Sequence, residues 1–151
     1  MELDKCINFL LSSAQNVVFQ YFNQKLSPYN VTPAQYGVLN CLWNHGELTP
    51  KQIGELLVLE ASSTSGILDR MQKNDLINRS IHPDNRRAIL VTTTKKADEL
   101  RQPVEKIVKD MNQHFMANLS DDEKDLLSKT LIRIIQMNKT DPPSIEGVFC
   151  D

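Results

Sequence analysis

The stretch HPDNRRAILVTTT, from His82 to Thr94, decides how the rest of the chain is interpreted. Its Pro-Asp-Asn segment favours a turn, and residues 89–94 are rich in β-branched side chains and contain neither glycine nor proline. Two adjacent cations, Arg86 and Arg87, stand between the turn and this run. The pattern predicts a two-stranded hairpin with a cationic tip.

The two strands of this hairpin are expected at residues 76–81 and 88–93. In the first, Ile77 and Ile81 are in step, as the period of two of a strand requires. Asp84 lies two residues before Arg86 and cannot favour an anionic partner by its charge. We expect it to brace the turn and to hold Arg86 extended.

The segment before the hairpin, ASSTSGILDRMQKND at residues 61–75, has helical period and two unlike faces. One face is formed by Thr64, Ile67, Leu68 and Met71, which follow the i, i+3, i+4, i+7 rule. The opposite face carries small hydroxyl groups and then charges: Ser62, Ser63, Ser65, Gly66, Asp69 and Arg70. For Arg70, two interpretations stay open, contact with a phosphate or a structural pair with Asp69.

A shorter helix precedes this one. Thr49-Pro50-Lys51-Gln52 has the sequence of a capping box, with Thr at the N-cap, Pro at the first helical position and Gln three residues after the Thr. An earlier helix is predicted to begin after Thr32 and to end near Gly46. Helix, tight turn, helix and cationic hairpin, in that order, predict a winged helix-turn-helix.

Long helices are expected on both sides of this lobe. Residues 3–22 carry a wide apolar stripe of helical period, which suits either a core helix or burial against a second subunit. Residues 97–137 return to helical period, with a kink or late start at Pro103 and a second capping box at residues 120–123. The tail after Lys139 is expected to be flexible.

Composition narrows the function. The 151 residues carry a net charge of −2 with a pI of about 5.9, so any binding to nucleic acid must depend on a local patch. No apolar run reaches the roughly 20 residues of a membrane span, and no signal segment opens the chain, so we expect a cytoplasmic protein. Neither the three scattered cysteines nor the histidines have metal-ligand spacing. We find no catalytic motif, and we predict no enzyme activity, metal or cofactor.

The run Pro83-Asp84-Asn85-Arg86-Arg87-Ala88-Ile89-Leu90-Val91 resembles the wing motif of the MarR family of bacterial transcription regulators. Residues 53–71, with the Asp69-Arg70 pair, are similar to that family's helix-turn-helix, and the likeness covers residues 3–137. The resemblance implies a homodimer that binds a short palindrome, usually as a repressor. It also implies that small phenolic or lipophilic ligands, or cysteine oxidation, release the dimer from DNA. The chain departs from the family at Val58 and Asp75, where glycine is frequent, and at Gly66, where a basic residue is frequent.

One branch of this family senses organic hydroperoxides through a cysteine near the start of its first helix, and Cys6 is the candidate here. It lies one or two residues before the expected position, and Leu10 stands where a tyrosine would polarise the thiol. An ordinary packing role for Cys6 therefore stays open. Cys41, beside Leu42 and Trp43, is expected in the core.

The sequence thus predicts a mainly α (α+β) chain: a winged helix-turn-helix at residues 32–94, dimerisation helices at 1–30 and 97–137, and a tail at 139–151. The predicted partners are palindromic double-stranded DNA, a second copy and a small-molecule effector, with no membrane. The expected DNA-binding residues are Ser62, Ser63 and Ser65 for bases, and Arg70, Lys73, Asp84, Arg86 and Arg87 for the backbone and wing. The alternative is a winged-helix protein-interaction module without specific DNA binding.

Overall fold

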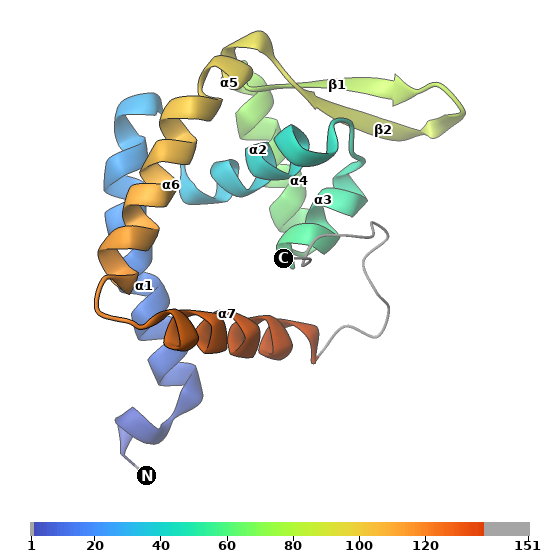
Figure 1. The fold of residues 1–151 in the computed structure, drawn as a ribbon. Coiled ribbons are helices and arrows are strands. Elements are labelled where there is room, and N and C mark those ends of the chain that lie inside the picture. Colours follow the sequence, from blue (N-terminus) through green and yellow to red (C-terminus); the bar gives the residue numbers. More distant parts are fainter. Residues whose placement is uncertain (1, 138–151) are drawn as a thin grey trace.

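A computed structural model describes residues 2–137, and in this range the chain is mainly helical with one two-stranded antiparallel sheet (Figure 1). The elements in chain order are η1 (Leu3–Lys5), α1 (Ile7–Leu26), η2 (Ser27–Tyr29), α2 (Pro33–His45), α3 (Pro50–Leu57), α4 (Ala61–Lys73), β1 (Ile77–His82), β2 (Asn85–Thr93), α5 (Lys95–Glu99), α6 (Arg101–Met116) and α7 (Asp121–Gln136). The predicted fold class is confirmed. The predicted tail at 139–151, with Cys150, lies outside the described residues.

Helices α2, α3 and α4 and the base of the β1–β2 ribbon form a winged helix-turn-helix lobe around one core. Leu39, Ile53, Leu68 and Val91 come from four different elements of the lobe and are fully buried. The capping boxes predicted at the starts of α3 and α7 are present, and α2 begins with a third at Thr32. Side-chain caps therefore fix where these helices begin.

A tight turn joins α3 to α4. Val58, the residue after α3, has the left-handed φ of 56°, and the Leu59 N–H donates to the Gly54 carbonyl oxygen at 2.8 Å. Gly54 permits this closeness, because a Cβ there would stand 3.0 Å from Oγ1 of Thr64 in α4. At this point the Thr64 side chain of α4 and the turn backbone therefore approach α3 closely.

The ribbon, referred to below as the wing, projects away from the helices (Figure 1). Its strands reach closer to the tip than predicted, because β2 begins at Asn85, which pairs with His82 across a two-residue loop. Ile77 and Ile81 both lie in β1, but only Ile77 reaches the core: Ile77 is 1% exposed and Ile81 is 68% exposed. The outer half of the wing extends beyond the core, so Ile81 has no core to pack against although it follows the strand period.

Helices α1 and α6 lie side by side and, together with η1 and α7, form what we call the stem. Tyr21 of α1 stacks on His114 of α6, with ring centroids 4.7 Å apart. Pro103 lies in the first turn of α6, where its missing N–H would have had no partner within the helix, so the late start is confirmed. Within residues 2–137 no helix is both long and apolar enough for a bilayer.

The stem leaves much apolar surface uncovered. No residue of α7 is buried, and several large side chains of η1, α1 and α7 are more than a third exposed, namely Leu3, Ile7, Phe9, Leu10, Val17, Phe19, Leu126, Leu127, Ile134, Ile135 and, just after α7, Met137. An isolated soluble chain seldom leaves so many large apolar side chains of neighbouring helices in water. The distribution distinguishes the stem from the well-packed winged lobe.

Candidate nucleic-acid interface

The outer face of α4 is polar and open. Ser62, Ser63 and Ser65 are all exposed, whereas Thr64 and Leu68 face the core, so the two predicted faces of this helix are confirmed as surface and core. No described side chain caps the first turn of α4. Its amide N–H groups and the serine hydroxyls are therefore free to donate to an external acceptor.

Two cations, Arg70 and Lys73, extend this face toward the end of α4. Both are exposed, and neither forms an ion pair with another residue in the described range. The Arg70 Nη1 lies 3.9 Å from the place where a Cβ would stand at Gly66. Arg70 therefore brings positive charge close to Gly66 on the outer face of α4.

Asp69 pairs with the wing instead of with its neighbour on α4. Its Oδ1 accepts a hydrogen bond of 2.8 Å from Nη1 of Arg79 in β1, so the structural pair of Asp69 with Arg70 is not formed. The Arg79 side chain is only 23% exposed. This ion pair helps to fix the angle between α4 and the wing. Sequence analysis did not predict it. The only signal in the sequence was the single charged residue, Arg79, midway between Ile77 and Ile81.

The wing tip presents Arg86 and Arg87, both exposed and neither paired with an anion of residues 2–137. They belong to the start of β2, where the register shifts and residues 86–88 have no pairing partner in β1. Backbone bonds brace the turn: the Arg87 N–H donates to Oδ1 of Asn85 at 3.1 Å, and the Asp84 N–H donates to Nδ1 of His82 at 3.0 Å.

This geometry changes the role expected for Asp84. Its carboxylate forms no ion pair or hydrogen bond with Arg86 or with any other residue in the described range. His82 and Asn85 provide the bracing that was predicted for Asp84. A contribution of Asp84 to DNA binding remains a prediction.

The base of the wing is joined to the end of α2. Leu48 and Val91 exchange two backbone hydrogen bonds, with the Leu48 N–H donating at 3.2 Å and the Val91 N–H donating at 2.8 Å. Because Thr49 caps α3 directly after this bridge, the orientation of both α3 and β2 depends on where α2 ends.

The two described cysteines differ. Burial raises the pKa of the Cys41 thiol to about 11, which keeps it protonated and confirms its place in the core. Cys6 is half-buried and stands at the N-cap of α1, without a side-chain capping bond. No cluster of three or more potential metal ligands occurs in the described part of the chain.

Comparison with known proteins agrees with this geometry. Residues 31–89 match the MarR family profile, and the chain is 30% identical over 102 residues to the organic hydroperoxide resistance transcriptional regulator of Bacillus subtilis, an alignment that covers 68% of this chain and 69% of that protein. The chain belongs to the MarR family. As a MarR-family member it is a DNA-binding transcription regulator and not an enzyme.

Solved structures confirm the fold of this MarR-family chain. CouR from Rhodococcus jostii bound to p-coumaroyl-CoA superimposes with a TM-score of 0.81 at 22% identity, covering 93% of this chain and 99% of that one. A cysteine mutant of MarR from E. coli complexed with operator DNA gives a TM-score of 0.79 at 24% identity, with coverage of 85% and 92%. At these identities the likeness establishes the winged-helix fold alone.

Proposed function

We propose that this MarR-family protein is a homodimer that binds a palindromic operator in a sequence-specific manner and acts as a repressor. The observation that carries the proposal is the alignment of unpaired donors on one lobe: the exposed serines of α4 and the two free arginines of the wing. The relatives are transcription regulators, so nothing favours the alternative of a protein-interaction module.

The DNA contacts follow from the dimensions of the double helix. A major groove about 12 Å wide accepts one helix, and α4 offers it hydroxyl groups short enough for the backbone to approach base edges. Arg70 and Lys73 then lie on the phosphate side. Because Arg86 and Arg87 are exposed and form no ion pair in the described range, a tip laid in the minor groove brings two guanidinium groups to its negative walls. The E. coli protein of the same fold has been solved in complex with operator DNA, which supports DNA binding by this lobe.

The dimer follows from the uncovered stem. Burial of one exposed Leu or Ile contributes roughly 1.5–3 kcal/mol, so a second copy that covers only a few of these residues supplies most of a stable interface. Two α4 helices would then lie about 34 Å apart, one turn of DNA, and a palindrome would match the twofold axis. Within residues 2–137, no other part of the chain covers these apolar residues.

The DNA interface is tested by Arg86→Ala in a fluorescence-anisotropy titration against the DNA upstream of the protein's own gene. We expect weaker binding and a salt slope reduced by about one. Lys129→Ala removes an equal charge from α7, where the side chain pairs only with Asp125, and should change neither quantity. Wild-type affinity and slope in Arg86→Ala would show that the wing does not contact DNA.

The dimer is tested by Leu127→Glu, which puts a charge on the apolar face of α7 without disturbing a buried contact of the same chain. Sedimentation velocity should show monomers, and operator affinity should fall together with dimer content. Gln136→Glu is the matched control, because it adds the same single negative charge at an exposed position on the opposite face of α7. A Leu127→Glu protein that still sediments as a dimer would refute this interface.

Release from DNA is proposed to occur in one of two ways. CouR carries a phenolic thioester ligand in its structure, which supports release by a small-molecule effector. If the effector binds only a splayed dimer, effector and DNA must weaken each other's binding equally.

The B. subtilis relative is named for organic hydroperoxide resistance, which supports release by thiol oxidation instead. If Cys6 is the sensor, mild organic peroxide abolishes DNA binding in the wild type but not in Cys6→Ser, and equal peroxide sensitivity of the two proteins would exclude Cys6.

A further inference from the structure

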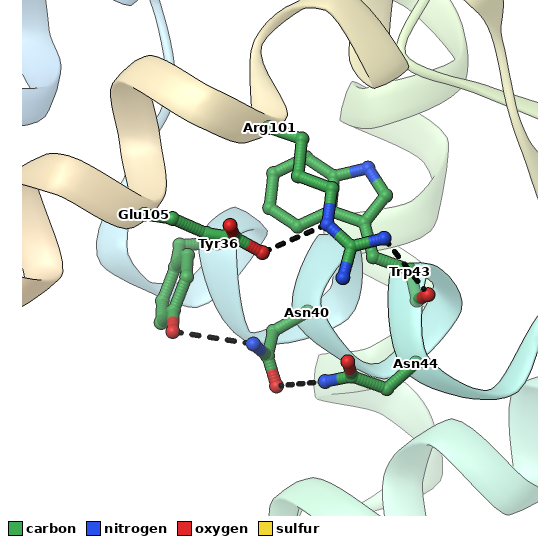
Figure 2. A network of polar contacts seen from close by, with 6 residues as sticks. All are labelled: Tyr36, Asn40, Trp43, Asn44, Arg101 and Glu105. Carbon is green, nitrogen blue, oxygen red and sulfur yellow. Dashed lines mark hydrogen bonds and ion pairs between the residues drawn. The ribbon is translucent and has the colours of Figure 1, made fainter.

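Arg101, the first residue of α6, connects the stem to the winged lobe (Figure 2). Its Nε donates to Oε1 of Glu105 at 2.8 Å, and its Nη1 donates to the backbone oxygen of Trp43 in α2 at 3.3 Å. The guanidinium also lies over the indole ring, 5.9 Å from the centroid. One side chain thus contacts two helices that are 58 residues apart in sequence.

The oxygen that Arg101 contacts is one that α2 leaves unpaired. The Gly46 N–H donates to the carbonyl of Leu42, and the carbonyl of Trp43 is the next along the helix, beyond the reach of the α2 hydrogen-bond ladder. A cation at this end also interacts favourably with the helix dipole. Arg101 therefore acts as a C-terminal cap of α2 that is supplied by a different helix.

Glu105 extends the same connection along α2. It lies between Arg101 and Tyr36, as Figure 2 shows, and burial, followed by the negative charge of Glu105, raises the pKa of the Tyr36 hydroxyl. The ring of Tyr36 packs edge-on against Phe22 of α1, with centroids 5.2 Å apart. Both ends of α2 are in this way held against the stem.

The end of α2 is also where the DNA-binding elements are attached. Five residues after Trp43, Leu48 forms the bridge to Val91 of β2, and Thr49 then caps α3. A displacement of the Trp43 carbonyl relative to α6 would therefore move the wing and the helix-turn-helix together with respect to the stem.

On the basis of this geometry, and resting on the proposed dimeric function, we propose that Arg101 is a positioning residue that sets the angle between stem and winged lobe and thereby the half-site spacing the dimer accepts. Arg101 does not touch DNA in this role. It narrows the range of lobe orientations, so that the two α4 helices fit one separation along the duplex and are strained at others.

The test uses the full-length protein and duplexes built from two copies of the half-site that the wild type selects from a randomised pool. The half-site centres are placed at the selected separation and one base pair nearer or farther, a change of about 3.4 Å and about 34° of rotation. We expect the wild type to prefer its own spacing by about tenfold, the effect of one hydrogen bond from a charged group. In Arg101→Ala the preference should narrow to about twofold.

The matched control is Lys106→Ala, which removes one cation from the same helix and breaks an exposed ion pair with Asp110 that does not involve α2. It should keep the tenfold preference, although its overall affinity changes with charge as in Arg101→Ala. Arg101→Lys keeps the charge but lacks the rigid planar fork whose Nε and Nη1 donate to two different acceptors, and it should also narrow the preference. Circular dichroism and sedimentation verify folding and dimer content for each variant.

A spacing preference that stays at about tenfold in both Arg101 variants overturns the positioning role, while operator binding by the wild type preserves the proposed function. A wild type that selects no half-site overturns the proposed function, and the positioning role with it. If Arg101 had a purely structural role, its replacement would lower stability and would lower affinity equally at every half-site spacing. Comparing affinities at the three spacings therefore distinguishes a structural role from a positioning role.

Discussion

The turn between α3 and α4 holds a valine in a conformation that favours glycine, and this gives a prediction about stability. Val58 has φ 56° and ψ 45°, where a non-glycine residue costs roughly 1–3 kcal/mol and a β-branched residue is a pronounced outlier. The side chain is 57% exposed, so its removal sacrifices little burial. Glycine would relieve the strain but add about 0.5–1 kcal/mol of unfolded-state entropy.

We therefore expect Val58→Gly to stabilise the protein by about 1 kcal/mol, or about 2–4 °C in Tm. The measurement is urea unfolding followed by the helical circular dichroism signal at one fixed protein concentration, because a dimer's stability depends on concentration. Val58→Ala is the control, since it removes the same contacts but keeps a Cβ and hence most of the strain. A Val58→Ala protein that is as stable as Val58→Gly would refute the reasoning.

Two further predictions concern the core. Gly54→Ala should destabilise the protein by about 1–3 kcal/mol, because its Cβ would meet Oγ1 of Thr64 at 3.0 Å and a backbone oxygen at 3.2 Å; in Gly37→Ala the Cβ meets only the flexible Leu57 side chain, so thermal unfolding should show a much smaller change. The raised pKa of Cys41 means that the folded state holds its proton more tightly than the unfolded state. The unfolding free energy should therefore decline as the pH rises from about 9 to about 11, and Cys41→Ala should flatten that decline in a series of urea titrations.

Local features of the structure could be predicted well from the sequence. The capping boxes at Thr49 and Ser120 involve residues three apart, so a short motif contains all the information they need. The buried face of α4 follows from helical period alone. In each case the physical cause acts within one turn of chain.

Features that depend on tertiary placement were missed. Arg79 reaches Asp69 from a different element, and Arg101 reaches Trp43 over 58 residues; in both cases the sequence shows only a charged residue with several possible partners. The exposure of Ile81 depends on how far the wing extends beyond the helices, which strand period does not encode. For Asp84, its position two residues before Arg86 suggested a contact between the two, whereas the turn is braced by hydrogen bonds to the side chains of His82 and Asn85.

The position of Trp43 has a practical consequence. It is the only tryptophan of the chain, and its indole Nε1 is buried without a hydrogen-bond partner, directly beneath the guanidinium of Arg101. The protein therefore contains a single tryptophan fluorophore, which lies at the joint between its two parts. Emission excited at the indole band reports on that joint alone, so candidate inducers can be screened on unlabelled protein, in competition with DNA, by following one spectral maximum.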